Sequence, residues 1–402
     1  MSLHYGRIFI DQRTDGVRSG YLAEEARRLP LEGPAAVWGD AQTGDLVEVR
    51  LEDGQLASVT LVARPVRWDA EGDGTRWLKT GRLKRLQQRH FALRAVREYL
   101  HAQGFWEVAS PLLVKGACPD AHLNAAFVQS AGPLVTSTEY QLKRLLVGGI
   151  KRPYSLTQNF RMGDLGTHHN PEFTMLEWAR AWETLDAIER DAEAMARTAA
   201  DAVGVGPVLH VGGQQVDLDA PWERLSVRKA FRMHLNVEIP TDFSTDGMAA
   251  AASCAGVEIP ASFLGDRHYV LSCLLDALQP YLGWPTPVFL REWPAFMCSS
   301  TAAGPDGEVG ERSELFIGGL EIADGFPFLR DAALQRELFE VELARRAADG
   351  KSPVPVDTRY LEALAQGIPP GAGMALGVDR LMMALLDAED IRGVMPFTWD
   401  EL

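Results

Sequence analysis

Apolar and polar positions alternate through the first part of the chain, in short runs typical of strands. Glu52-Asp53-Gly54 separates two such runs and predicts a tight hairpin between them. The polar, glycine-rich stretch Trp68–Gly74 predicts a linker. Residues 1–78 are therefore expected to form a small β-rich domain with its linker, for which an OB-like barrel is one candidate shape. The predicted strands are Arg7–Asp11, Asp45–Leu51 and Gln55–Val62.

Residues 79–402 show helical periods between strand-like runs and are expected to form a second, larger domain. Leu93, Val96 and Leu100 fall on one helical face before a stop at Gly104. Strands and helices follow each other without regular βαβ alternation, which favours an antiparallel α+β domain over a doubly wound sheet. The predicted strands are Phe105–Val108, Tyr154–Phe160, Phe173–Ala179, Leu315–Ile322 and Gly371–Gly377, and the predicted helices are His90–Gln103, Leu185–Val203, Ala332–Ala348 and Val378–Leu386.

Composition excludes several classes of protein. The 402 residues are 46% hydrophobic and 24% charged, as in a globular protein. The net charge of −15 argues against non-specific binding of polyanions. Four scattered cysteines predict neither a zinc site nor a disulfide framework, so a reducing, cytoplasmic compartment is expected. No apolar run reaches the roughly 20 residues of a membrane span, and no signal peptide is evident, so no membrane association is expected.

A basic stretch opens the second domain and has two interpretations. It forms either the solvated face of a helix or a patch for an acidic macromolecule. Residues 1–78, by contrast, carry 9 Lys+Arg against 13 Asp+Glu, a poor footprint for an RNA-binding module. The basic residues are Arg76, Lys79, Arg82, Lys84, Arg85 and Arg89.

The loop between the strands Tyr154–Phe160 and Phe173–Ala179 carries the most informative chemistry. Arg161 opens this loop, and arginine binds phosphate through a bidentate fork. Phe173, at its other end, is suited to stack on a base. His168-His169 with Glu172 lacks the spacing of a metalloprotease site. The loop therefore predicts nucleotide binding.

Two further groups of residues point to a nucleotide. Glu314 and Glu321 lie seven residues apart, on opposite faces of a regular strand unless a bulge reverses the phase. On one face they form a candidate Mg²⁺ site for a triphosphate. Gly371–Gly377 lets a ligand approach the backbone, and Arg380 follows one helical turn later. The chain has neither a GxGxxG fingerprint nor a P-loop.

Taken in order, these groups resemble the catalytic domain of class-II aminoacyl-tRNA synthetases. Within the lysyl branch the chain is most similar to the elongation factor P–(R)-β-lysine ligase family, over about residues 82–402. That family implies an α+β fold with an antiparallel sheet flanked by helices. The similar segments are Thr136–Val147, Asn170–Glu177, Gly319–Phe326 and Ala375–Leu381.

The resemblance implies a role for each of these side chains. Arg161 and Arg380 would be catalytic, and Glu314 and Glu321 would hold Mg²⁺. Leu86–Pro111 would form a dimer-interface helix and strand, so a homodimer is expected. The implied ATP-binding residues are Arg161, His169, Phe173, Glu314, Glu321, Gly377 and Arg380, and the implied amino-acid-binding residues are Ser137, Glu139, Ala179, Asp324, Phe328 and Ala375.

The chain departs from the family pattern around the amino acid. Gly163 replaces the glutamate of Arg-x-Glu, with Asp164 as a neighbouring substitute. Ala179 and Phe328 replace the tyrosine and the glutamate that hold the distal ammonium in the family. Asp324 replaces an asparagine, whereas Ala375 agrees with the β-lysine branch. We therefore expect an amino acid that lacks a lysine-like terminal amine, or an amine that is bound differently.

The implied activity is activation of an amino acid by ATP, with transfer from the adenylate to a lysine of an elongation factor P-like protein. One alternative is tRNA aminoacylation, in which residues 1–78 would bind an anticodon. A second is a non-catalytic synthetase paralogue, supported by Gly163 and opposed by the intact Arg161, Arg380, Glu314 and Glu321. A third is an amide-forming ligase that acts on small molecules through the same adenylate.

Overall fold

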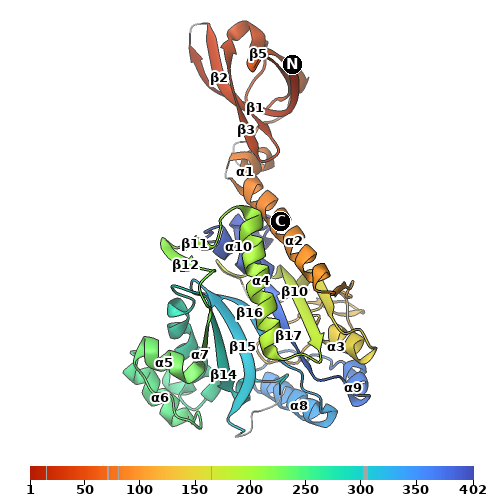
Figure 1. Ribbon diagram of the computed structural model, residues 1–402, viewed down its shortest axis with the longest axis vertical. Coiled ribbons are helices and arrows are strands. Elements are labelled where there is room, and N and C mark those ends of the chain that lie inside the picture. Colours follow the sequence, from red (N-terminus) through yellow and green to blue (C-terminus); the bar gives the residue numbers. More distant parts are fainter. Residues whose placement is uncertain (15, 70–71, 80, 164, 302–306) are drawn as a thin grey trace. The chain divides into compact units, whose positions relative to one another are not determined.

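The computed structural model describes residues 1–14, 16–69, 72–79, 81–163, 165–301 and 307–402. The chain divides into two compact units, Met1–His90 and Phe91–Leu402 (Figure 1). The expected domain boundary after residue 78 stays a prediction. In the part of the chain that the structure describes, no helix is long and apolar enough to cross a membrane.

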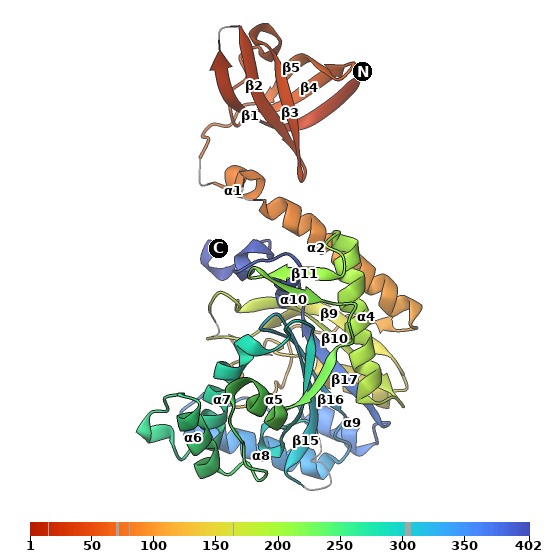
Figure 2. The ribbon, with the colours of Figure 1, turned by 60° about the vertical axis from the view of Figure 1, so that its left-hand side comes forward.

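The first unit contains an antiparallel sheet of five strands in the order β3-β2-β1-β4-β5. Figure 2 shows that these strands form a curled sheet. The core of this unit includes Ile8, Leu22 and Trp38. Asp53 and Gly54 both have positive φ, which confirms the predicted hairpin turn. The β-rich prediction is confirmed, and the OB-like shape stays an interpretation. The elements are β1 (Ser2–Thr14), β2 (Val17–Glu24), β3 (Arg27–Pro34), η1 (Ala35–Trp38), β4 (Leu46–Glu52) and β5 (Gln55–Ala63).

The predicted linker Trp68–Gly74 is wrong at both of its ends. Trp68 packs edge-on against Phe9, with the two ring centroids 5.7 Å apart, and the Arg7 guanidinium lies 5.2 Å from its ring. The helix α1 (Asp73–Lys79) already begins inside the stretch, and residues 70 and 71 lie outside the described part. Trp68 thus packs onto the first unit although its neighbours in the sequence are polar, because partial burial of its large apolar ring is favourable.

The basic stretch continues into the long helix α2 (Arg82–Ala102). Arg82 and Arg89 are buried, and the Arg82 guanidinium lies 4.8 Å from the Trp77 ring. The stretch is therefore not wholly a solvated helix face.

The second unit is built on a sheet of eight strands, in the order β13-β14-β15-β16-β17-β10-β9-β6. The five inner pairings are antiparallel, as predicted, whereas the two edge pairings, β13 with β14 and β6 with β9, are parallel. The strands are β6 (Trp106–Glu107), β9 (Pro153–Phe160), β10 (Glu172–Ala181), β13 (Glu223–Ser226), β14 (Val288–Pro294), β15 (Val309–Ile317), β16 (Leu320–Pro327) and β17 (Gly371–Gly377).

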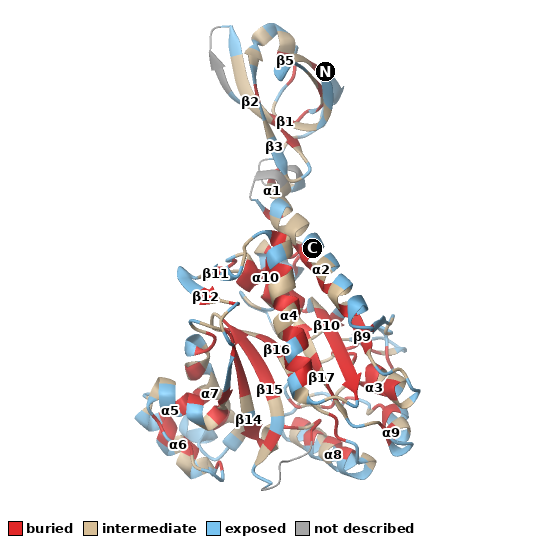
Figure 3. Ribbon diagram, viewed as in Figure 1, coloured by how far each residue is buried: buried red, intermediate tan, exposed pale blue. Residues whose placement is uncertain are grey.

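Helices cover one face of this sheet and the candidate site lies on the other. On β10, Leu176 and Trp178 join the core under α4 (Leu185–Val203), as do Met374 and Leu376 of β17. Figure 3 shows the buried residues of these strands and of α4. Because side chains alternate along a strand, the residues between them, such as Glu177, face away from this core. The predicted sharing of faces on β10 is confirmed.

The predicted strand Leu315–Ile322 is wrong. It is two strands, β15 and β16, joined by a turn at Gly318-Gly319. Both glycines have positive φ, of 58° and 80°, a conformation that a two-residue hairpin turn requires and glycine adopts without strain.

The remaining elements surround the sheet. A second apolar core includes Phe231, Met248 and Leu271. The remaining helices are α3 (Glu139–Val147), α5 (Val227–Leu235), α6 (Thr245–Cys254), η2 (Ala261–Phe263), α7 (Arg267–Leu278), η3 (Gln279–Tyr281), η4 (Ala295–Met297), α8 (Ala332–Ala348), α9 (Thr358–Ala365), α10 (Val378–Leu385), η5 (Ile391–Gly393) and η6 (Trp399–Glu401). The short strands are β7 (Phe127–Val128), β8 (Gly132–Pro133), β11 (Val208–Val211) and β12 (Gln214–Asp217).

Candidate functional site

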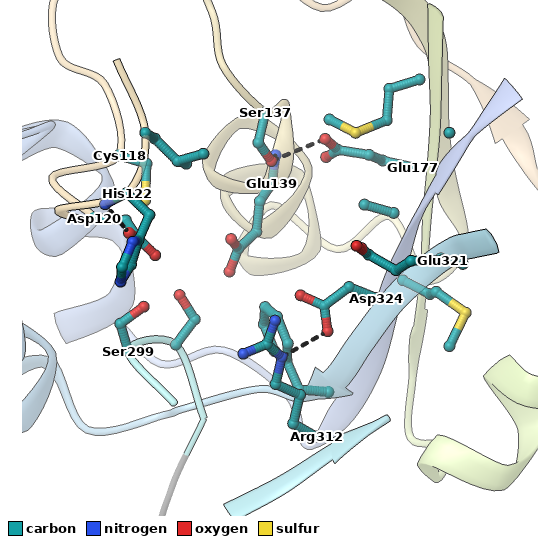
Figure 4. Close-up of a pocket in the computed structure, with 18 of the residues that line it drawn as sticks. Cys118, Asp120, His122, Ser137, Glu139, Glu177, Ser299, Arg312, Glu321 and Asp324 are labelled. Atoms are coloured by element: carbon teal, nitrogen blue, oxygen red, sulfur yellow. Dashed lines mark hydrogen bonds and ion pairs between the residues drawn. The ribbon is translucent and has the colours of Figure 1, made fainter. Parts of the chain in front are cut away.

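A cavity of about 450 Å³ lies on the face of the sheet that α4 leaves open. Its lining brings together every side chain that the sequence singled out for ATP or the amino acid, except Glu314. In Figure 4, Glu139 projects from α3 into the centre of the cavity. Glu177 and Glu321 lie on one side of it, and Asp120 and His122 on the other.

Arg161 and Phe173 form one wall, as the hairpin loop predicted. The backbone N–H of Arg161 donates to the Pro171 carbonyl at 2.9 Å, which closes the loop across the ends of β9 and β10. Its Nε donates to the Thr136 carbonyl at 3.3 Å. The guanidinium lies 5.2 Å from the Phe173 ring centroid, so one cation and one aromatic face are fixed side by side.

Arg380 lines the cavity from the first turn of α10. Its Nη1 lies 3.3 Å from a Glu321 carboxylate oxygen and donates to the Glu321 carbonyl at 3.1 Å. Its Nη2 donates to Nε2 of His169 at 2.6 Å. Gly377, the N-cap of α10, has no side chain to block the cavity. Asp379 accepts from the Thr174 N–H at 2.8 Å and so ties α10 to β10.

Gly163 stands where the family pattern has a glutamate, and its backbone explains why a glycine suits this loop. Its φ is +92°, in a region where L side chains are strained. The preceding Met162 N–H donates to the Asn124 carbonyl at 2.7 Å, which holds the turn. Asp164, the neighbouring carboxylate considered as a substitute, lies outside the described residues.

A bulge brings Glu314 and Glu321 to one face, which is the condition that the sequence left open. Glu314 pairs with Asp324 and Phe316 with Glu321, and the register shifts between Leu315 and Phe316. Residue 322 is therefore the extra residue, in β16 rather than at the glycines. The negative charge of Glu321 contributes to a raised Glu314 pKa, after the larger effect of burial.

Arg312 was not predicted as a site residue, and it forms an ion pair with Glu314. Its Nη2 donates to Glu314 at 2.6 Å and its Nε to Asp324 at 2.9 Å. Burial raises the pKa of both carboxyl groups, and Arg312 opposes that effect. Arginine two residues before a glutamate shares its strand face. The two-residue spacing of Arg312 and Glu314 was the signal from which the sequence could have predicted that Arg312 lies beside Glu314.

Glu177 is a second residue that the prediction missed. This buried carboxylate accepts from the Ser137 hydroxyl at 2.8 Å, and from the Thr138 N–H and hydroxyl at 2.9 Å each. Burial raises the pKa of Glu177 to about 7 in spite of these donors. Ser137 thus positions Glu177 and also accepts from the Glu139 N–H at 3.2 Å.

An apolar wall closes the cavity beyond Ala375. Ala375 lies between Glu177 and Asp324 on the neighbouring strands. The Phe328 ring packs with Ala179 in one apolar cluster and lies against Gly371, where a Cβ would come within 2.7 Å of it. Phe328 fits because its neighbours on these strands are small.

Lys143 is a third residue that the prediction missed. It is buried on α3, one turn after Glu139, and its Nζ lies 2.5 Å from a Glu139 oxygen. Burial alone would lower the pKa of Lys143, but Glu139 and Tyr360 raise it above its ordinary value. The ammonium lies 5.4 to 5.8 Å from the ring centroids of Phe326, Phe328 and Tyr360.

The far side of the cavity is formed by the loop around Asp120 and by α7 and α8. Arg345 donates to the His268 ring at 2.8 Å, and Glu342 accepts from the Ala121 N–H at 2.9 Å. Burial and the neighbouring arginines lower the pKa of His268 to about 4. Among the residues that the structure describes, no group of three or more His, Cys, Asp and Glu is arranged to hold a metal.

Comparison with known proteins identifies the family of the chain. The family described as "tRNA synthetases class II (D, K and N)" matches residues 75–401. An elongation factor P–(R)-β-lysine ligase from Erwinia tasmaniensis is 33% identical over 339 residues, which are 82% of this chain and 99% of the relative. Ligases of the same name from Enterobacter sp. strain 638 and Salmonella paratyphi B are each 32% identical over 335 residues, covering 81% of this chain and 98% of the relative. The chain therefore belongs to the class II tRNA synthetase family of the D, K and N type.

Proposed function

We propose that the chain is an ATP-dependent ligase that activates an amino acid as its adenylate and transfers the acyl group to a lysine of an elongation factor P-like protein. The observation that supports this proposal is that one cavity is lined both by Arg161 and Arg380, the expected nucleotide-binding arginines, and by the residues expected to bind the amino acid. The curated relatives, which the chain matches over nearly their whole length, are named for that reaction.

The nucleotide would lie between the Arg161–Phe173 pair and Arg380. Arg161 would bind the α-phosphate, and the Phe173 ring beside it would stack under the adenine. Arg380 would cover the other face of the base, with His169 near the outer phosphates. Fixed cations aimed at phosphate oxygens stabilise the charge that builds up as pyrophosphate leaves.

The carboxylates fit Mg²⁺ in part. Glu321 lines the cavity, and a magnesium ion commonly binds one or two carboxylates together with substrate phosphates. Glu314 shares its face but is bound to Arg312, so it would complete the site only by releasing that arginine. Bound there, the ion would neutralise triphosphate charge. Of the chain's own residues, Arg161 would orient the α-phosphate and Arg380 would hold the base.

The reaction proceeds by two displacements. An oxygen of the substrate carboxylate attacks the α-phosphorus, a new P–O bond forms, and the bond to pyrophosphate breaks. The acceptor amine then attacks the acyl carbon, a C–N bond forms, the C–O bond to AMP breaks, and the amine loses a proton. Ser137 and Glu139 would orient the amino group of the substrate for the first step.

The assembly would be a homodimer in the cytoplasm, where a translation factor is available as acceptor. The exposed apolar residues Leu112, Leu113, Phe127 and Val128 support an interface. They lie on segments joined by hydrogen bonds, because Val114 donates to the Pro133 carbonyl and Leu134 to the Ala126 carbonyl. Exposed apolar residues that lie together commonly mark a protein interface.

Parallel transfer assays test the proposal. The chain is incubated with ATP, Mg²⁺ and a mixture of radiolabelled amino acids, with either elongation factor P or total tRNA of the same source. Label should enter the protein, depend on Arg161, and survive in Arg359→Ala, whose exposed side chain lies on α9. Label in tRNA alone would support the tRNA-charging alternative, and absence of label from both would contradict the ligase.

A further inference from the structure

The amino-acid end of the cavity contains an ammonium that belongs to the chain. Lys143 is almost fully buried, with only 2% of its side chain exposed, yet it lines the cavity. Its Nζ is held by the Glu139 carboxylate and by three aromatic rings within 6 Å. A carboxylate combined with aromatic rings is the arrangement that binds an ammonium group.

The other carboxylates at this end are also occupied. Asp324 is paired with Arg312 at 2.9 Å, and Glu177 accepts three hydrogen bonds. Each acidic residue among the described lining residues accepts a hydrogen bond or an ion pair. These residues are Asp120, Glu139, Glu177, Glu321, Asp324, Glu342 and Asp379.

The wall that faces Lys143 offers no further anion. Phe328, Phe326, Ala179 and Gly373 form the surface beside the lysine, and the Phe328 ring is only 8% exposed. A second ammonium brought to this end would meet like charge at short range in a dehydrated site. Glu139 and Asp324 are already paired with Lys143 and Arg312, so a second ammonium would have to share these carboxylates or displace a buried cation.

We propose that the amino-acid subsite takes a substrate whose side chain carries no positive charge, and that Lys143 and Phe328 are the residues that exclude a terminal ammonium. The Lys143 ammonium already binds Glu139 and the aromatic rings, where a substrate ammonium could otherwise bind. Phe328 is apolar and so provides no negative charge to pair with a substrate cation. This inference rests on the proposed adenylate-forming activity and specifies its substrate.

Amino-acid-dependent exchange of pyrophosphate into ATP tests this specificity, with kcat/KM measured for lysine, (R)-β-lysine, ornithine and arginine and for a set of neutral and acidic amino acids. The best neutral or acidic substrate should exceed lysine at least about 10-fold. Preference for lysine, β-lysine or another cationic amino acid would overturn the inference and leave the ligase intact. Absence of exchange with every amino acid would overturn the ligase proposal itself.

Two variants test the residues, and the readout is the ratio of kcat/KM for lysine to that for the best neutral substrate. Because both values come from one preparation, partial misfolding cancels from the ratio. Lys143→Met removes the cation that is paired with Glu139. Phe328→Glu adds a carboxylate at the position of the ring whose centroid lies 5.6 Å from the Lys143 ammonium. Each should raise the ratio about 10-fold or more. Lys229→Met, at an exposed position on α5, should leave it unchanged. An unchanged ratio in both pocket variants would contradict the assignment.

Discussion

The two ends of the cavity differ in how closely they follow the synthetase pattern. At the proposed nucleotide end, the residues that the resemblance singled out are retained and line one cavity: Arg161, Phe173, His169, Glu321 and Arg380. At the amino-acid end, the corresponding positions hold an apolar wall, and two cations of the chain occupy the acidic residues there.

This difference indicates that the residues for the reaction and the residues that contact the substrate side chain are under different constraints. Every adenylate-forming enzyme must handle the same triphosphate, so the residues that bind it are constrained by the chemistry. Residues that touch the side chain of the amino acid are constrained only by the choice of amino acid, and they change when that choice changes. The membership of the family therefore supports the chemistry more strongly than it supports lysine.

Removing either nucleotide-end arginine should have the largest effect. Arg161→Ala and Arg380→Ala each remove a cation aimed at the phosphates or the base, and a roughly 10²- to 10³-fold loss of pyrophosphate exchange is expected. The exposed Arg359→Ala serves as the matched control and should retain full activity. Exchange within about twofold of the unsubstituted chain in both variants would mean that the nucleotide end is not used.

Arg312 forms ion pairs with both Glu314 and Asp324, so its removal should lower the stability of the folded chain. Arg312→Ala leaves Glu314 and Asp324 without their cation, and a loss of about 3 kcal/mol in the free energy of unfolding is expected. Arg232→Ala breaks an exposed pair with Glu238 and should leave the free energy of unfolding close to that of the unsubstituted chain. Similar unfolding midpoints in urea for the two variants would argue that Arg312 is dispensable.

Glu177 should make stability depend on pH at the amino-acid end. Burial raises its pKa from 4.5 to about 7, so the folded state binds the proton more tightly than the unfolded state. The stabilisation is complete below the unfolded pKa and is lost as pH rises from about 4.5 to 7, by roughly 2 to 3 kcal/mol. Glu177→Gln should flatten this part of the stability curve. An unchanged slope between those pH values would show that Glu177 does not cause it.

Gly163 offers the smallest test, on the loop of Arg161. Its φ of +92° should make Gly163→Ala cost about 1 kcal/mol, measured by thermal unfolding. Gly166 lies in the same loop with open space around it and no positive φ, so Gly166→Ala is the control and should be neutral. Equal effects at both positions would remove the backbone explanation for the missing glutamate.

The sequence predicted the elements with long, regular patterns and most of the candidate residues that the fold brings to one cavity. The helix Leu185–Val203 and the strand Gly371–Gly377 were predicted with their observed bounds, because their apolar periods are uninterrupted. The hairpin that places Arg161 beside Phe173 was predicted because both strands and the intervening loop are contiguous in the chain. Local patterns of this kind can be recognised without knowledge of the fold.

Features that depend on distant residues were missed. Gly318-Gly319 was placed inside a strand, since only the pairing of β15 with β16 shows that it is a turn. The bulge that aligns Glu314 with Glu321 is likewise a property of two strands. Arg312 and Lys143 were missed because a charged residue on a strand or helix is usually solvated, and only the fold shows that these two are enclosed.

The mass of the acceptor protein after reaction tests both ends of the cavity in one measurement. Elongation factor P from the same source is incubated with the chain, ATP, Mg²⁺ and the complete set of amino acids, and its intact mass is determined. The account predicts an increment equal to one neutral or acidic aminoacyl group on a single lysine, absent with Arg161→Ala. An increment equal to lysine would contradict the altered amino-acid end, and no increment would contradict the proposed ligase.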